Sequence, residues 1–336
     1  MYAVYVSNAE SGDISVLRLD AERGALTAVQ RVEVGGEVMP LALGPARTRL
    51  YAVRRSEPRE VLSFEIDPKS GRLDAIGAAA LPHSMASIAT DRSGRFLFSA
   101  SYGGNVIAVS PIDADGVVQA AHQVLPTGPH AHAIHADPSN RFVFATNLGS
   151  GVMLQFRFDA ASGRLAPNTP AALQPHAEAS PRHFAFGHDA RFVYLLNELD
   201  AAIDVLALDG NSGTLRTVQT LDSLPRGFDG EPWAADIHLT PDGRFLYSSE
   251  RRSGTLAAFR VDAENGTLTL VGHVPTEAQP RGFNVTPDGR FLIAAGQRSH
   301  RVALYAIDAQ TGALNALGDC AAGRGPNWVE SIALDR

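Results

Sequence analysis

Lysine and cysteine are almost absent from this chain of 336 residues. Lys69 is the only lysine, and it lies within a turn pattern described below, so Schiff-base chemistry and phosphate-loop chemistry are poor explanations of the function. Cys320 is the only cysteine, so no intrachain disulfide can form, which fits a reducing cytoplasm. No apolar run approaches the ~20 residues of a membrane span, and the N-terminus lacks the pattern of a signal peptide. We therefore expect a cytoplasmic protein with no membrane partner.

Charged and aromatic residues are also scarce. Charged residues make up 19% of the chain and aromatic residues 7%, and the formal net charge is −7. This acidic balance disfavours a general nucleic-acid binder. By contrast, the chain holds 31 glycines and 20 prolines, and no stretch has the pattern of a long helix. The composition is typical of a large all-β fold with many turns.

An internal repeat runs through the whole chain. An arginine followed by aromatic and aliphatic residues opens a strand in each copy, and successive arginines are separated by 46, 46, 50, 53 and 46 residues. The members are Arg49, Arg95, Arg141, Arg191, Arg244 and Arg290. A further copy begins at Ser331 and stops before its second strand, and the apolar segment 1–7 supplies that strand. Copies that close head to tail predict a ring, because a linear array would need polar caps at both ends.

A second marker, out of phase with the first, confirms the count of copies. An aspartate followed by a glycine ends an alternating apolar run at Asp20, Asp67, Asp113, Asp159, Asp209, Asp262 and Asp308. Glycine tolerates the positive φ of a tight turn and aspartate hydrogen-bonds its own backbone, so each marker predicts a hairpin. In the copy around residue 200 we expect strands over 182–187, 191–197, 202–208 and 214–221. Four antiparallel strands in each of seven copies predict a seven-bladed β-propeller, formed by residues 1–336 as a single domain.

Residues that differ between copies at equivalent positions are better functional candidates than residues that recur. The recurring arginines are expected to build the ring. The start of each innermost strand and the end of the next strand meet at one end of the channel, where polar residues from different blades converge. Aligned on the recurring arginine, the starts are Ala86, His132, Arg182, Ala235 and Arg281, with Glu330 as the nearest match in the closing blade, and the ends are Arg55, Tyr102, Leu148, Glu198, Arg251 and Gln297.

The residues at this end of the channel bear on two kinds of ligand, a metal ion and an anion. His130 and His132 have a spacing that places both imidazoles on one strand face, but no carboxylate or third histidine accompanies them, so the pattern does not predict a metal site. Arginines at the blade ends of an acidic chain favour an anion site, because the guanidinium fork matches carboxylate and phosphate oxygens.

Several long segments resemble the bacterial seven-bladed 6-phosphogluconolactonase family. They lie in the same order along the whole chain: 101–106 (SYGGNV), 180–184 (SPRHF), 197–199 (NEL), 233–244 (WAADIHLTPDGR), 279–285 (QPRGFNV), 293–300 (IAAGQRSH) and 323–329 (GRGPNWV). The superfamily includes the fungal 3-carboxy-cis,cis-muconate lactonizing enzyme, whose proposed catalytic group is one histidine, two arginines and one glutamate. By motif that group falls on His132, Arg182, Glu198 and Arg251. The segment 128–133 (GPHAHA) is closer to the general lactonase and cyclase pattern than to the enterobacterial type, which leaves the substrate open.

The resemblance implies hydrolysis of a sugar-acid lactone by direct attack of water, because the chain has no Gly-x-Ser-x-Gly elbow. Glu198 or His132 would be the base, and Arg182 would polarise the carbonyl. Arg251 and Arg281 would hold an anionic end of the substrate. Substrate-binding roles are also expected for Tyr102, Gln297 and Glu330. No cofactor is expected, the partner is a small anionic lactone, and a self-closed ring can be a monomer.

Three alternatives remain open. A cycloisomerase closing a carboxymuconate and a lactonase for an unphosphorylated sugar acid need the same arginines. A propeller without catalytic activity, acting as an interaction platform, needs exposed aromatic residues on one face, and aromatic residues are few.

Overall fold

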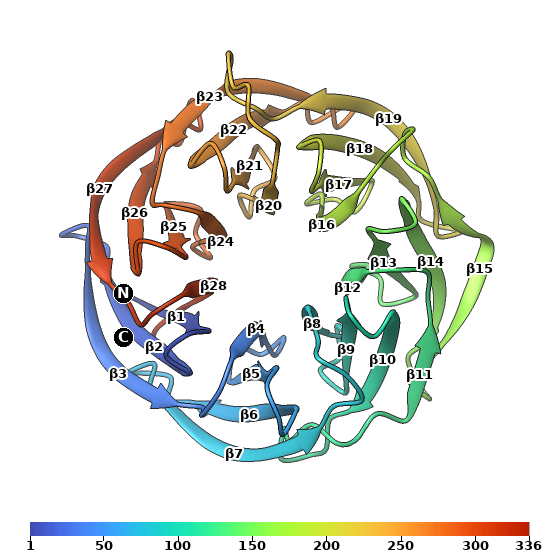
Figure 1. Cartoon of the computed structure of the whole chain (residues 1–336), viewed down its shortest axis with the longest axis horizontal. Helices are drawn as coiled ribbons and strands as arrows, with labels where there is room; N and C mark the ends of the chain where they lie inside the picture. The colour runs from blue at the N-terminus through green and yellow to red at the C-terminus, as the bar shows by residue number, and fades with distance from the viewer. Residues whose placement is uncertain (336) are drawn as a thin grey trace.

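In a computed structural model, which describes residues 1–335, the strands form seven antiparallel sheets of four strands each, arranged as blades around a central channel (Figure 1). From the innermost strand outward, the first three blades are β28 (Pro326–Ala333), β1 (Tyr2–Asn8), β2 (Asp13–Asp20), β3 (Ala25–Glu33); β4 (Val38–Leu43), β5 (Arg49–Arg54), β6 (Glu60–Ile66), β7 (Leu73–Ala80); and β8 (Ser87–Thr90), β9 (Phe96–Ser101), β10 (Val106–Pro111), β11 (Gln123–Pro126). The other four blades are β12 (Ala131–Ala136), β13 (Phe142–Asn147), β14 (Val152–Asp159), β15 (Arg164–Leu173); β16 (Pro181–Phe186), β17 (Phe192–Asn197), β18 (Ala202–Asp209), β19 (Thr214–Asp222); β20 (Ala234–Leu239), β21 (Phe245–Glu250), β22 (Thr255–Val261), β23 (Leu268–Pro275); and β24 (Pro280–Val285), β25 (Phe291–Gly296), β26 (Arg301–Ile307), β27 (Leu314–Ala321).

The two ends of the chain close the ring. β1 pairs antiparallel with β28, so that Tyr5 lies opposite Glu330 and Tyr2 lies opposite Ala333. Figure 1 accordingly shows β1 beside β28, and the backbone nitrogen of Leu334 donates to the backbone oxygen of Met1 at 3.1 Å. The prediction that the first residues supply the second strand of the last copy is confirmed, and ring closure leaves no blade without a neighbour on either side.

The hydrophobic core lies between the blades. Each cluster of buried apolar residues draws its members from two adjacent blades, as where Tyr5 and Ile14 pack with Leu50 and Phe64. Another cluster joins Val4 and other residues of the first blade to the last one. Because strand side chains alternate between faces, a blade buried on both faces needs apolar residues at nearly every position, which explains the near-continuous buried runs in β1 and β9.

The recurring arginines hold neighbouring blades together, as expected. The guanidinium of Arg191 lies 5.3 Å from the centre of the Phe192 ring and donates to the carbonyl oxygen of Ala263 in the next blade, at 2.6 Å. Arg141 and Arg244 repeat this arrangement in the two blades on either side. Since the same contacts recur around the ring, they explain the repeat without reference to function.

The predicted hairpin turns are also present. Asp209 accepts backbone hydrogen bonds from Asn211 and Ser212, and Gly213 has a φ of 67°, a conformation that favours glycine. A side chain at Gly213 would collide with Phe142 of the preceding blade, so this turn is also part of the blade interface. The four strands expected around residue 200 agree with β16, β17, β18 and β19 within one residue at each end.

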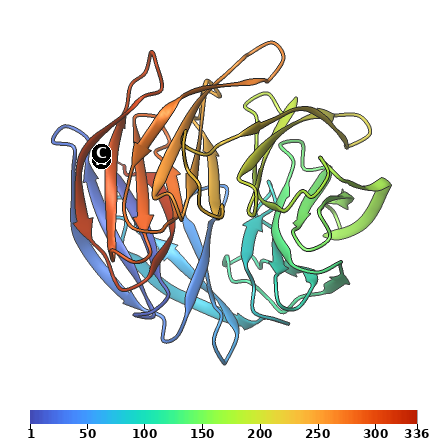
Figure 2. The ribbon, with the colours of Figure 1, turned by 45° about the horizontal axis from the view of Figure 1, so that its top comes forward.

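The innermost strands line the channel, and Figure 2 shows the blades standing around it when the ring is tilted. Residues 1–335 contain no helix long and apolar enough to cross a membrane. At one end of the channel the innermost strands begin and their partner strands end. The side chains at this end form the candidate site.

Candidate active site

A β-bulge opens several of the innermost strands and directs one side chain out of the ladder. In β16, Pro181 pairs with Asn197 and His183 pairs with Leu196, so Arg182 has no opposite residue in β17. Arg281 in β24 is skipped in the same way. Bulges bend a strand and re-aim its side chains, so they place residues from separate blades toward the same point.

Arg182, Glu198 and Arg251 form one buried network that joins two blades. The Nε of Arg182 lies 3.7 Å from Oε2 of Glu198, and Arg251 donates from a terminal nitrogen to Oε1 of the same carboxylate. Burial alone would raise the pKa of Glu198, but the two guanidiniums and the hydrogen bonds from Arg251 and Trp233 hold it below its usual value. Glu198 is therefore a carboxylate whose charge is fixed by its partners.

Trp233 is a part of this network that the sequence interpretation did not identify. Its indole nitrogen donates to Oε1 of Glu198 at 2.8 Å, and the guanidinium carbon of Arg251 lies 3.8 Å from the ring centre. Arg251 also donates to the backbone oxygens of Trp233, at 3.0 Å, and Ala234, at 2.8 Å. The indole thus fixes both charged partners. The available signal was its rarity, since it is one of two tryptophans.

Arg281 is the arginine of this end that stays uncommitted. Within residues 1–335 no carboxylate lies within ion-pair distance of its guanidinium, while burial and the nearby charges of Arg182 and Arg55 lower its pKa to about 10. It remains charged at neutral pH. Three guanidiniums near one carboxylate give this end an excess of positive charge, as the anion-site hypothesis predicted.

His132 contributes a neutral imidazole beside these cations. It is 6% exposed, and burial together with the charge of Arg182 lowers its pKa well below the usual value. No described residue gives its Nδ1 a hydrogen-bond partner, and the same holds for the Nε of Arg182. The ring lies 5.1 Å from His183, whose Nδ1 is 2.7 Å from Oδ1 of Asp236. An imidazole nitrogen and a guanidinium N–H that make no hydrogen bond to a described residue are therefore both present at this end.

Tyr102 and Gln297 lie at the mouth of this end. The Tyr102 ring is 37% exposed and lies 6.0 Å from the His132 ring, and burial and the charge of Glu198 raise its pKa. Gln297 accepts a hydrogen bond from the side chain of Gln279 at 2.9 Å. His130 stacks on Tyr102 with ring centres 4.1 Å apart and so does not converge with His132 as metal ligands would.

The expected placement of Glu330 at the start of its strand is wrong. Pro326 pairs with Asn8 and Trp328 pairs with Ser7, so Asn327 is the equivalent of Arg182 in β28. Glu330 lies three residues further along the strand, where it accepts a hydrogen bond from the indole nitrogen of Trp328 at 3.2 Å. The other seven predicted residues are all found at the starts and ends of the strands that meet at this end of the channel. We call this group, together with Trp233, the arginine end.

The chemistry available at the arginine end is acid–base and electrostatic. A neutral imidazole accepts a proton, a guanidinium N–H stabilises a developing oxyanion, and an unpaired guanidinium binds an anion. Cys320 lies on the outer strand β27, far from the channel in the order of strands. Among residues 1–335 no group of three or more His, Cys, Asp or Glu side chains is arranged to hold a metal ion.

Comparison with protein families gives a match over nearly the whole chain. The family model described as "Lactonase, 7-bladed beta-propeller" matches residues 1–331. Among curated relatives, the 6-phosphogluconolactonase of Pectobacterium atrosepticum is 46% identical over 332 residues, which are 99% of each chain. The 6-phosphogluconolactonase of Serratia proteamaculans is 43% identical over 330 residues, 98% of each chain.

Solved structures of the same architecture superpose closely. A periplasmic gluconolactonase from Pseudomonas aeruginosa has a TM-score of 0.92 at 30% identity, covering 99% of both chains. A putative 6-phosphogluconolactonase from Bacteroides uniformis has a TM-score of 0.90 at 27% identity, covering 98% of this chain and 99% of the other. The ring and its closure are therefore shared with these proteins.

Proposed function

Because the chain belongs to the lactonase family of seven-bladed β-propellers, we propose that it hydrolyses 6-phospho-D-glucono-1,5-lactone to 6-phosphogluconate, a reaction of the pentose phosphate pathway. The names of relatives that align over nearly the whole chain support this substrate. The observation that carries the proposal is the arginine end itself, where the neutral imidazole of His132 and the guanidinium of Arg182 lie beside the uncommitted Arg281.

His132 is the general base in this proposal. Both carboxylate oxygens of Glu198 lie against guanidiniums, and Oε1 also accepts a hydrogen bond from the indole of Trp233, so the carboxylate is already occupied by its partners. The imidazole of His132 is neutral and free to accept a proton from water as the water attacks C1 of the lactone. Glu198 instead fixes Arg182 and Arg251 in place, which makes it a positioning residue.

The arginines stabilise the charges of the reaction. The Nε–H of Arg182 donates to the carbonyl oxygen as it gains negative charge. When the tetrahedral intermediate collapses, the bond from C1 to the ring oxygen breaks, and the ring oxygen takes the proton that His132 accepted. The product is a hydroxy acid that ionises to a carboxylate. Arg281 holds the phosphate, since Arg251 is already committed to Glu198 and to backbone oxygens.

A second candidate substrate is the unphosphorylated glucono-1,5-lactone. The similarity to the gluconolactonase of Pseudomonas aeruginosa, at 30% identity over the whole chain, favours it. The same groups would act at C1, and Arg281 would have no phosphate to bind.

The test is a comparison of substrates on the purified protein. Rates on 6-phosphogluconolactone, gluconolactone and 3-carboxy-cis,cis-muconate are measured at one pH, with the spontaneous hydrolysis of each lactone subtracted. The phosphorylated lactone should have the highest kcat/KM. No acceleration of lactone hydrolysis above the buffer rate, or faster turnover of the muconate, would contradict the proposal.

Location and assembly are part of the same proposal: a cytoplasmic monomer. Cell fractionation and light scattering of the purified protein test these two statements. Recovery with the periplasmic fraction would overturn the first, and a mass that is a multiple of 35.7 kDa would overturn the second.

A further inference from the structure

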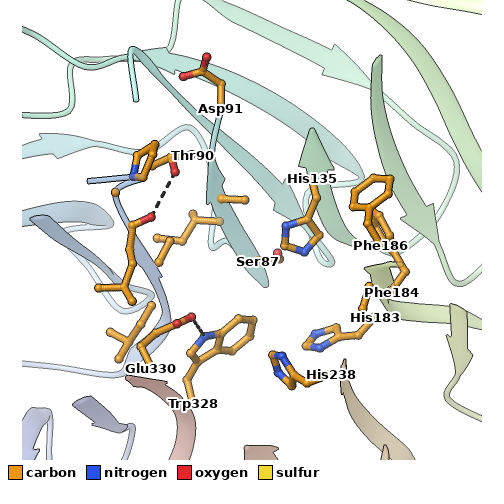
Figure 3. A pocket seen from close by; sticks show the side chains of 18 of the residues that line it. Ser87, Thr90, Asp91, His135, His183, Phe184, Phe186, His238, Trp328 and Glu330 are labelled. Carbon is orange, nitrogen blue, oxygen red and sulfur yellow. Dashed lines mark hydrogen bonds between the residues drawn. The ribbon is translucent and has the colours of Figure 1, made fainter. Parts of the chain in front are cut away.

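Histidine and carboxylate side chains meet at ion-pair distance in two places within residues 1–335. The first is a cavity of about 500 Å³ further along the innermost strands, where Figure 3 shows His183, His238 and Trp328. There one carboxylate, Asp236, lies 2.7 Å from Nδ1 of His183 and 3.2 Å from Nε2 of His238. The second place reverses this ratio, with one imidazole between two carboxylates, and it is connected to the arginine end.

His176, in the segment between β15 and β16, is held through both ring nitrogens. Its Nδ1 lies 3.1 Å and 3.0 Å from the two carboxylate oxygens of Asp204, and its Nε2 lies 2.9 Å from Oδ2 of Asp200. Ionised carboxylates only accept hydrogen bonds, so both nitrogens donate and the imidazole is in its charged form. Burial lowers the pKa of His176, but the bonds to Asp200 and Asp204 outweigh burial and raise this pKa above the usual value of ~6.5.

We call His176, Asp200 and Asp204 the clasp. Asp204 is its buried centre on β18, and the hydroxyl of Thr220 on β19 donates to its Oδ1 at 2.6 Å. Asp200 lies in the turn before β18 and accepts a hydrogen bond from the backbone nitrogen of Ala202 at 2.9 Å. The charged groups that face the imidazole are thus the two carboxylates, and β19 contributes an uncharged hydroxyl. Loss of the proton would leave both carboxylates facing a neutral ring that can donate only one hydrogen bond.

Asn197 connects the clasp to the arginine end. Its side-chain nitrogen donates to Oδ2 of Asp204 at 2.8 Å, and its side-chain oxygen accepts from the backbone nitrogen of Ser180 at 3.0 Å. The carbonyl oxygen of Ser180 accepts from the backbone nitrogen of Glu198 at 2.8 Å. Asn197 and Glu198 are consecutive in the chain, and Ser180 is two residues before Arg182. The clasp is therefore linked by hydrogen bonds to the backbone that carries both of these charged side chains.

The closing blade has a similar arrangement with an arginine in place of the histidine. Asn8 ends β1 as Asn197 ends β17, and its side-chain nitrogen donates to Oδ1 of Asp13 at 2.7 Å. Oδ2 of Asp13 lies 2.6 Å from a terminal nitrogen of Arg31. A guanidinium keeps its charge at any physiological pH, whereas an imidazole does not. The titratable version therefore occurs in the blade that contributes Glu198 to the arginine end.

We propose that the clasp is a proton-controlled positioning device for the arginine end. With the imidazole of His176 charged, Asp204 is held in place and keeps Asn197 and Ser180 in the arrangement that fixes Glu198. When the proton leaves, the two carboxylates of the clasp repel each other, and Glu198 loses its fixed position against the guanidiniums. The inference rests on the proposed function, in which Glu198 orients the arginines. The clasp residues act through Glu198 and are positioning residues as well.

A pH profile of hydrolysis tests the effect of the clasp on the reaction. The clasp is intact below the raised pKa of His176 and is released as pH rises through it. For 6-phosphogluconolactone, with spontaneous hydrolysis subtracted at each pH, kcat should fall about fivefold or more across this step. KM should change less, because Arg281 is outside the network. His176→Gln should give the lower kcat at every pH. His176→Arg copies the cation of the closing blade and should keep the higher kcat without the fall.

The fluorescence of Trp233 reports the position of Glu198 without an assay of hydrolysis. Its indole nitrogen donates to Oε1 of Glu198 at 2.8 Å, and Trp328→Phe leaves it as the only tryptophan. In the Trp328→Phe protein, the emission should change with pH in one step, at the midpoint that NMR gives for the imidazole of His176. The step should disappear after His176→Gln. The matched control is His122→Gln, which changes a partly buried histidine in another blade and should leave the step in place.

The two measurements separate this inference from the proposed function. Absence of lactone hydrolysis with the fluorescence step present would contradict the reaction and support the clasp. A kcat that stays constant through the titration of His176, or a fluorescence step that survives His176→Gln, would overturn the clasp.

Asp200→Asn covers the case in which variants of His176 fold poorly. The side chain of Asp200 is 39% exposed, and its loss removes one of the two carboxylates that raise the pKa of His176. The midpoints of the rate profile and of the fluorescence step should therefore both move to lower pH. Midpoints that stay where they are in the unmutated protein would overturn the proposal.

Discussion

Each end of the channel is organised around one buried carboxylate, and the two carboxylates differ in their partners. Glu198 faces guanidiniums, which stay charged at any physiological pH, whereas Asp236 faces imidazoles, which can be neutral. The first end therefore has guanidiniums as the partners of its carboxylate, whereas the other, which we call the histidine end (His135, His183, Asp236, His238, Trp328 and Glu330), has titratable partners. The same blades thus provide an anion site and, below it, a region of different chemistry.

The difference between the two ends of the channel arises from neighbouring residues on the same strands. Arg182 and His183 are consecutive in β16, yet the bulge sends the first toward the arginine end and leaves the second to line the cavity. A ring of strands can therefore host two environments separated by one layer of side chains. The comparison predicts that substitutions at the arginine end reduce hydrolysis, while those at the histidine end mainly alter stability.

The largest expected effect is at Arg182. Arg182→Lys keeps the charge but removes the fixed Nε–H donor, and kcat/KM for the lactone should fall about 100-fold or more. The matched control is Arg191→Lys in the same blade, which affects a contact between blades and should leave kcat/KM within about threefold. Near-normal hydrolysis by the Arg182 variant, assayed above the spontaneous rate, would remove this residue from the mechanism.

Substitution of His132 should have the second-largest effect on hydrolysis. His132→Asn removes the proton acceptor while keeping a polar side chain of similar size, and kcat should fall about 100-fold. His130→Asn, two residues earlier and only partly buried, is the control and should stay near the unmutated rate. If instead Glu198→Gln abolished hydrolysis and His132→Asn did not, the assignment of the base would have to be reversed.

Asp236 belongs to the histidine end, where the comparison predicts an effect on stability and little effect on hydrolysis. Asp236→Asn removes a buried carboxylate that accepts hydrogen bonds from His183 and from the backbone nitrogens of Ile237 and Phe283. The free energy of unfolding should fall by about 3 kcal/mol, measured by urea denaturation. The folded fraction should hydrolyse the lactone within about fivefold of the unmutated rate. A loss of activity as large as that at Arg182, with stability unchanged, would place the catalytic centre at the histidine end.

The smallest expected effect concerns pH. Burial lowers the pKa of His238, but the Asp236 carboxylate outweighs it and raises this pKa above the unfolded value of ~6.5. The resulting stability is fully present below pH ~6.5 and is lost as pH rises through the folded pKa. His238→Gln should therefore destabilise the protein more at pH 6 than at pH 8, by less than about 1 kcal/mol. Equal effects at both pH values in thermal unfolding would contradict the raised pKa.

The repeat made most of the fold predictable. Each copy carries its own turn signals, and the strand boundaries they predict around residue 200 agree with the structure within one residue. The ring closure followed from the incomplete last copy. Positions of the candidate residues were predictable too, because aligned copies place equivalent residues at the same end of the channel.

What the repeat did not predict depends on contacts between copies. Glu330 was misplaced because the strand following it is β1, which begins at Tyr2 and has no arginine on which to align. Trp233 directly precedes β20 and Asp236 lies within it, and the bulge between Ala234 and Ile237 determines which of these neighbours turn toward which end. The cavity combines side chains from six blades, which no single copy encodes.

The most direct test of the central claim measures selectivity at the arginine end. The ratio of kcat/KM for 6-phosphogluconolactone to that for gluconolactone is compared between the unmutated protein and Arg281→Gln. Loss of the uncommitted guanidinium should reduce this ratio at least tenfold while the rate on gluconolactone changes little, because a guanidinium contact with a phosphate is a charge-assisted hydrogen bond. An unchanged ratio would contradict the assignment of the arginine end as the site that binds the phosphate.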